Sequence, residues 1–169
     1  MVTQLVTLLA VLLGSVSSYL ATAAMERARY RRDLDAGWTE RKLDAYTNYI
    51  NDIKVMRGVA RRMLRDTGFD PNLPIALPQE EGLPLLAEAE ARRSSSAERV
   101  LLVGSEDVIN ALRALNQVVW RIERHARGLI KNADADTWNQ TSSDFHSAMD
   151  NFQECARRDL RVPGSYVSR

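Results

Sequence analysis

Residues 2–32 of the chain read VTQLVTLLAVLLGSVSSYLATAAMERARYRR, and charge is distributed very unevenly along this segment. No Asp, Glu, Lys or Arg occurs in residues 2–25, and four arginines follow at once: Arg27, Arg29, Arg31 and Arg32. As a helix, residues 2–25 would be about 36 Å long, which exceeds the hydrocarbon core of a bilayer at about 30 Å. The sequence therefore predicts a transmembrane anchor over residues 1–25.

The arginines also predict the orientation of this anchor. No Lys or Arg precedes the apolar stretch of residues 5–13, so the positive-inside rule keeps the side that carries the arginines in the cytoplasm. We expect a single-pass protein of the cell membrane with its N-terminus outside. A cleaved signal peptide is the alternative, because Ala21-Thr22-Ala23 fits the small-x-small pattern of cleavage sites. The product would then be an exported helical domain.

Two sets of residues are candidate contact sites near the bilayer. Small residues recur at every fourth position of the anchor, where they would let two membrane helices approach closely: Ala10, Gly14, Ser18 and Thr22. This stripe predicts a homo-oligomer formed through the anchor, although small residues are also common in membrane helices generally. The four arginines from Arg27 to Arg32 are candidates for contact with anionic lipid headgroups, or they set topology alone.

The rest of the chain predicts an all-α fold in which the anchor continues as a helix into an antiparallel domain like a four-helix bundle. Apolar residues repeat every three or four positions in four segments that we expect to be helices, at about 26–66, 84–103, 105–131 and 137–161. The two longest apolar stripes predict the inner faces of the first and third helices: Leu43, Tyr46, Ile50, Ile53, Met56, Ala60 and Met63, and Val108, Ile109, Leu112, Leu115, Val119, Ile122 and Leu129. Charged residues such as Asp44 and Asp52 fall on the solvated face of the first helix. Four of the five prolines lie in a connection over residues 67–83 and at its end, where Pro84 suits the first turn of the second helix. Ser105 suits the N-cap of the third helix. The bundle domain then covers residues 26–162, with a tail at 163–169.

Residues that carry chemistry are sparse and scattered. Two histidines, His125 and His146, fall on different expected helices, and neither belongs to the Glu-x-x-His pairs of di-iron bundles. Cys155 is the only cysteine and lies among apolar residues, which favours a packing role over a nucleophile. We therefore predict no catalytic, cofactor-binding or metal-binding residue. A net charge of +1 argues against a nucleic-acid partner.

Several segments resemble a broad group of bacterial single-pass membrane proteins of uncharacterised function. The segments are the end of the span at Tyr19-Leu20, the arginine-rich turn, residues 41–46 (RKLDAY), residues 103–108 (VGSEDV) and residues 155–160 (CARRDL). The resemblance implies an N-terminal anchor and a helical domain, and it implies no activity and no site residues.

Together these patterns predict a membrane-anchored helical scaffold or interaction protein without catalytic activity. Its expected partners are the lipid bilayer, a second copy of itself and another membrane or cytoplasmic protein. A metal-binding bundle that uses His125, His146 and nearby acids is an alternative. A phage-related or defence membrane protein is another, since size and anchor are compatible with it.

Overall fold

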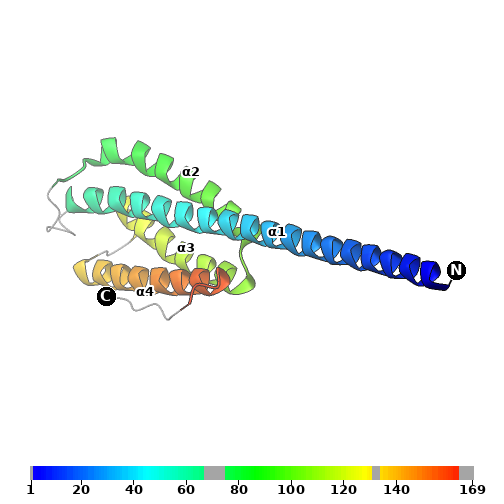
Figure 1. The fold of residues 1–169 in the computed structure, drawn as a ribbon. Coiled ribbons are helices and arrows are strands. Elements are labelled where there is room, and N and C mark those ends of the chain that lie inside the picture. Colours follow the sequence, from blue (N-terminus) through cyan, green and yellow to red (C-terminus); the bar gives the residue numbers. More distant parts are fainter. Residues whose placement is uncertain (1, 67–74, 131–133, 164–169) are drawn as a thin grey trace. The chain divides into compact units, whose positions relative to one another are not determined.

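The computed structural model of the chain describes residues 2–66, 75–130 and 134–163. Inside the first helix, the side chains of residues 2–18, 20, 21, 23, 24, 28, 31–34 and 66 are outside the description. The described residues form four helices and no strand: α1 (Val2–Asp66), α2 (Gln79–Val103), α3 (Glu106–Ala126) and α4 (Ala135–Asp159) (Figure 1). The predicted all-α class is thus confirmed. Among the described residues, no helix is both long and apolar enough for a membrane crossing.

The chain divides into two compact units, residues 1–40 and residues 41–169. The sequence predicted a boundary at residue 25, at the last neutral position. The first unit is a stretch of α1 whose described side chains are mostly exposed, including the large apolar ones of Tyr19, Met25, Tyr30 and Trp38. The second unit holds every residue of the hydrophobic core, from Ala45 to Ala156.

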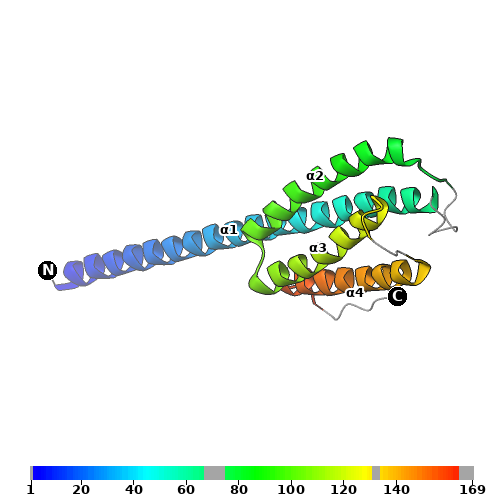
Figure 2. The same cartoon turned by 180° about the vertical axis from the view of Figure 1, so that it is seen from behind.

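In the second unit, contacts between side chains show that the helices are antiparallel neighbours (Figures 1 and 2). Tyr46 and Tyr49, early in this part of α1, meet the edge of the Phe152 ring late in α4. Farther along α1, Arg57 donates to Ser142 near the start of α4. Helix α3 runs against α4 in the same way, with an ion pair between Arg121 and Asp144 at 2.9 Å.

The core is a set of apolar stripes with helical spacing. On α3 five of the predicted positions are buried, namely Val108, Leu112, Leu115, Val119 and Ile122, whereas Ile109 is only half-buried. Burying each such side chain contributes roughly 1.5–3 kcal/mol, so these stripes are the main stabilising feature of the bundle. On α1 the predicted stripe is largely buried, but Leu43 is exposed and Tyr49 is buried in its place.

Helix α2 begins at Gln79, five residues before the predicted start at Pro84. Leu77 is buried, and its amide donates to the carbonyl of Arg62, so the segment before α2 is fixed against the end of α1. Pro78 then occupies the N-cap, and its carbonyl accepts the amide of Gly82. Pro84 therefore lies inside the helix. Since proline has no N–H, Pro84 cannot donate to the carbonyl of Glu80 as a helical residue would. Both residues are exposed, so water can hydrate that carbonyl instead.

Helices α3 and α4 also differ in detail from the predicted ranges. Helix α3 ends at Ala126 rather than residue 131, because Gly128 takes a φ of 67° and the chain leaves the helix there. Leu129, predicted on the apolar stripe of α3, consequently lies outside the helix and is exposed. Helix α4 begins at Ala135, two residues before the prediction, because the side chain of Asp134 caps it by accepting from the amide of Thr137.

Candidate functional site

The residues predicted near the bilayer fall mainly outside the description. The side chains of Ala10, Gly14 and Ser18 are not among the described ones, and neither are those of Arg31 and Arg32. The remaining three, Thr22, Arg27 and Arg29, are exposed. The small-residue stripe and the arginine contact with lipid therefore remain predictions.

The two histidines lie on different helices, and their surroundings differ. His146 on α4 is exposed and meets the edge of Phe145. His125 on α3 is buried against Trp138 and Thr141. Across the described segments, no three His, Cys, Asp or Glu side chains come together as metal ligands. Cys155 is buried and receives a contact at 3.2 Å from the Arg158 guanidinium.

The hydrogen bond to Thr141 indicates which ring nitrogen of a neutral His125 carries the proton. The Thr141 hydroxyl donates its single proton to the carbonyl of Thr137, so it can only accept from Nε2–H of His125, at 3.4 Å. The Nδ1 atom is then an unprotonated acceptor, buried and without a hydrogen-bond partner among the described residues. Burial, with the charge of Arg121 as a smaller cause, lowers the pKa of His125. The neutral side chain thus acts as part of the core.

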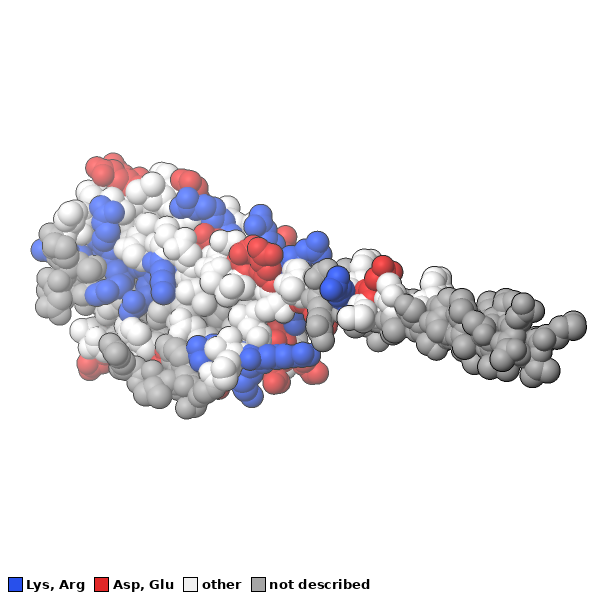
Figure 3. Space-filling view, viewed as in Figure 1, with Lys and Arg blue, Asp and Glu red and all other residues white. Residues whose placement is uncertain are grey.

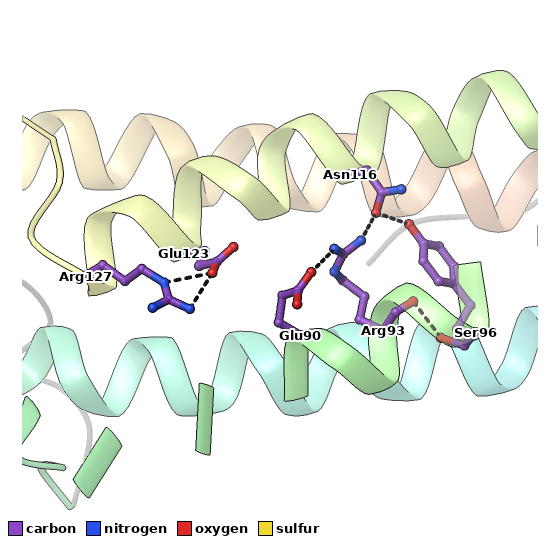
Figure 4. Close-up of polar contacts among 7 residues, drawn as sticks. Glu90, Arg93, Ser96, Asn116, Glu123 and Arg127 are labelled. Carbon is purple, nitrogen blue, oxygen red and sulfur yellow. Dashed lines mark hydrogen bonds and ion pairs between the residues drawn. The ribbon is translucent and has the colours of Figure 1, made fainter. Parts of the chain in front are cut away.

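A polar cluster around the buried Arg93 joins three helices (Figure 4). Arg93 on α2 is only 3% exposed, and its guanidinium donates to Asn116 of α3 at 2.6 Å and to Glu90 at 3.0 Å. The Tyr49 hydroxyl on α1 donates to the same oxygen of Asn116 at 2.9 Å. Burial raises the pKa of Tyr49, and the positive charge of Arg93 opposes this rise in part. The two terminal nitrogens of Arg93 are bonded within this cluster, whereas its buried Nε has no hydrogen-bond partner among the described residues, and the shared hydrogen bonds between helices suit a structural role.

A second polar cluster closes one end of the bundle. Asp159, at the end of α4, accepts from Lys42 and Tyr46 of α1, and from the side chain of Ser105 before α3. Burial by itself would raise the pKa of Asp159, but the hydrogen bonds from Tyr46 and Lys42 and the charge of Lys42 together hold that pKa below its ordinary value. Ser105 is the N-cap residue, as predicted, but its side chain makes no capping hydrogen bond.

A concave surface lies on the bundle between α1 and α2. Two pockets of about 270 Å³ each lie there, and they share Asn48 and Arg99. Their walls are formed by Arg41, Asp44, Ala45, Asn48 and Asp52 of α1 and by Arg92, Ser95, Ser96, Arg99, Leu102 and Val103 of α2. We call this surface the α1–α2 groove. Because the two pockets share residues, they form one elongated depression.

The groove carries side chains that the rest of the chain does not engage. Leu102 is 84% exposed although it lies in the lining. Asp44, Asp52 and Arg99 line the groove, and their side chains form no hydrogen bond or ion pair within the part of the chain that the structure describes. Within the described residues, Arg92 makes only an exposed pair with Glu88 at 3.6 Å. The exposed leucine and the charged groups without partners among the described residues make the groove a candidate binding surface.

The groove was not predicted from the sequence. Asp44 and Asp52 were assigned to the solvated face of the first helix, and nothing in the local pattern of α2 marks Arg92 and Arg99 as neighbours of that face. The burial of Arg93 did leave a signal, because Leu86, Ala89, Arg93 and Val100 share one helical stripe. Both signs of charge occur across the visible face of the bundle (Figure 3).

A comparison of the chain with family models, curated proteins and solved structures gave no match.

Proposed function

We propose that this protein is a membrane-anchored helical interaction module that works by binding and not by catalysis. The observation that carries the proposal is the α1–α2 groove, which combines an 84% exposed leucine with charged groups that are unpaired among the described residues. The other polar clusters of the bundle, around Arg93 and Asp159, have side chains that bond mainly to one another. The groove is thus a surface of the bundle on which a partner could bind.

The anchor in this proposal is residues 1–25, with the second unit in the cytoplasm. Its support is the pattern of the sequence: a neutral stretch of membrane-spanning length followed by Arg27, Arg29, Arg31 and Arg32. Tethering to a bilayer raises the effective concentration of the groove toward other proteins of the same membrane. A weak binding surface can then be sufficient for function.

The anchor and its orientation are tested by labelling a single exposed cysteine in cells. In a chain that carries Cys155→Ala and Leu129→Cys, the thiol would replace a side chain that is 58% exposed. We expect the protein to stay in the membrane fraction after alkaline carbonate washing, and we expect an impermeant maleimide to label it only after lysis. The control is a chain with Val11→Arg and Leu12→Arg, which should lose carbonate resistance, because each arginine costs about 2.5–3.5 kcal/mol at the centre of a span.

Two results would contradict the anchor. Labelling in intact cells would place the second unit outside. A mature N-terminus just after Ala23, found by protein sequencing, would instead support the exported helical domain.

A further inference from the structure

We infer that residues 53–65, near the end of α1, bind an acidic helix of a partner protein, which crosses α1 at Gly58. We call this part of α1 the basic segment. It is separate from the α1–α2 groove, whose α1 wall ends at Asp52. The inference goes beyond the proposed function, and it depends neither on the groove nor on residues 1–25.

Charge on the basic segment has a single sign. Its sequence, IKVMRGVARRMLR, contains five basic residues and no acidic one. Most of its apolar residues are buried in the core: Ile53, Met56, Ala60, Met63 and Leu64. Its basic residues are exposed or half-buried: Lys54, Arg57, Arg61, Arg62 and Arg65. Figure 3 shows Lys and Arg side chains gathered over the part of the bundle where α1 ends. The bundle thus uses the apolar face of the segment and leaves a mainly basic face at the surface.

Gly58 lies at the centre of this basic face. On a helix the surface neighbours of a residue are three and four positions away, and three of these four neighbours of Gly58 are basic: Lys54, Arg61 and Arg62. Arg65 follows two turns beyond Gly58 on the same side. Gly58 itself is exposed, and a Cβ atom on it would meet no atom within 4 Å. The packing of the chain therefore does not require a glycine at this position.

Gly58 supplies room at the surface and no hydrogen bond. A glycine inside a helix costs stability relative to alanine, so a glycine at an open position points to a use outside the fold. One such use is the close approach of a second backbone. The amide of Gly58 lies inside α1, where the hydrogen bonds of the helix engage it, so it is not a free donor for an anion. A crossing helix is an element that uses such room.

The charges around Gly58 determine the sign of the crossing helix. Basic residues three and four positions apart repel one another, as Arg57, Arg61 and Arg65 do. From Lys54 to Arg65 the basic face extends over a rise of about 16 Å, or about three turns. Carboxylates one turn apart on a partner helix would face these cations and remove the repulsion. We therefore expect an acidic helix with a small residue where it crosses Gly58.

Two other anionic partners fit this face less well. Single-stranded nucleic acid stacks its bases on aromatic side chains, and residues 53–65 contain no Phe, Tyr or Trp. The headgroup layer of a membrane is flat, whereas the arginines of the segment are half-buried. Arg57, for example, donates to Ser142 at 3.2 Å and lies over the ring of Phe145. Side chains that project from a helix can reach such recessed guanidinium groups.

The experiment measures the binding of fluorescein-labelled peptides to the full chain in non-ionic detergent micelles by fluorescence anisotropy. The test peptide carries Glu at every fourth position among Ala and Gln residues. The control peptide has the same composition with Glu at every fifth position, which spreads the charge around the helix. Circular dichroism compares the helix content of the two peptides. The unchanged chain should bind the test peptide at least about tenfold more tightly than the control peptide.

Gly58→Ala separates binding from folding. The added methyl group should stabilise α1, because the site is open, but it lies where the partner helix crosses. We expect a more stable protein that binds the test peptide at least about fivefold more weakly. Gly37→Ala is the matched control, since Gly37 also lies in α1 and a Cβ atom on it would meet no atom within 4 Å. It should leave the binding unchanged.

Charge variants test the basic residues. Lys54→Glu, at an exposed position, and Arg61→Gln should each weaken binding of the test peptide at least about fivefold. Arg99→Glu in the α1–α2 groove and Arg124→Glu on α3 change the net charge as much as Lys54→Glu does. These two variants should bind like the unchanged chain. Thermal unfolding verifies that each variant is folded.

The inference is overturned if the unchanged chain binds the two peptides equally or binds neither, or if Gly58→Ala binds like the unchanged chain. It is also overturned if Arg99→Glu weakens binding as much as Lys54→Glu does. A chain that binds oligouridylate or phosphatidylserine vesicles through Lys54, and not the test peptide, overturns it too. Failure of the groove as a binding surface would leave these measurements unaffected, so the two proposals are distinguishable.

Discussion

At the scale of single residues, the bundle is characterised by polar groups that hold helices together from within. Asp159 is the clearest case, because its side chain is 9% exposed and links both ends of the second unit's sequence. A carboxylate in such a place is stabilising only while it is ionised and paired with Lys42 and Tyr46. Its effect on stability must therefore depend on pH.

Asp159→Asn should lower the free energy of unfolding by about 1–3 kcal/mol at pH 7, through the lost charged hydrogen bonds. The pKa of Asp159 is lowered in the folded state, so its contribution is present above the unfolded value near 4 and is lost as the pH falls through the folded pKa. Urea unfolding at pH 7, 5 and 3 should show a smaller difference between the two chains at pH 3 than at pH 7. Asp107→Asn, at an exposed position on α3, is the control, and a constant difference at all three pH values would contradict this account.

His125 predicts a separate pH effect at higher pH. Its pKa is lowered below 6.5 in the folded state, so the unfolded chain binds the proton more tightly and stability falls as the pH drops below about 6.5. His125→Phe keeps an aromatic ring against Trp138 and should remove this slope between pH 7 and 5. Thermal unfolding measures it. His146→Phe, at an exposed position, should retain the slope of the unchanged chain, and equal slopes in all three chains would argue against the assignment.

At the scale of helices, the close approach of α1 and α2 depends on one glycine. A Cβ atom on Gly82 would lie 2.5 Å from Cγ of Met63, a distance that real contacts do not reach. Gly58, on α1, has no atom within 4 Å of the equivalent position. The same substitution should therefore have opposite effects at the two sites.

Gly82→Ala should destabilise the bundle by about 1–3 kcal/mol, because overpacking exceeds the gain in helix propensity. Gly58→Ala should stabilise it by about 0.5–1 kcal/mol. Chemical denaturation of both variants gives the two free energies. The double variant with Gly82→Ala and Met63→Ala should lose less stability than the sum of the two single losses, because the shorter side chain leaves room for the added Cβ atom. If the two losses in the free energy of unfolding simply add, the two residues do not meet.

The sequence predicted the helices well where a single apolar stripe determined them. Five of the seven stripe positions predicted for the third helix are buried, because a regular period of apolar residues determines which face points inward, whereas Ile109 is half-buried and Leu129 is exposed. The start of α2 was not predictable in the same way, since it depends on Leu77 bonding to Arg62 of α1. The groove depends on two helices meeting at a particular register, and neither helix alone contains that information.

At the scale of the whole molecule, the two units differ in what stabilises them. All buried core residues lie in residues 45–156, within the second unit. The chain of residues 41–169 therefore contains the complete described core. Its folding should not require the first unit.

A protein made of residues 41–169 should fold by itself and unfold in one cooperative transition. Circular dichroism and thermal unfolding measure this, and the midpoint should lie within a few degrees of that of the second unit in the full chain. Adding Leu112→Asp to the short protein is the control, because a buried unpaired charge costs several kcal/mol and should abolish the transition. A short protein without a cooperative transition would mean that residues 1–40 contribute to the fold.

The ion pair between Lys42 and Asp159 has a mechanical consequence. It joins side chains 117 positions apart in the sequence, so the chain enters and leaves the bundle at the same end. A tension applied between residues 41 and 163 would act across the axes of α1 and α4 and would separate the two helices starting from that end. The bundle should then yield at low force, turn by turn, and the Lys42–Asp159 pair should be the first bond to break.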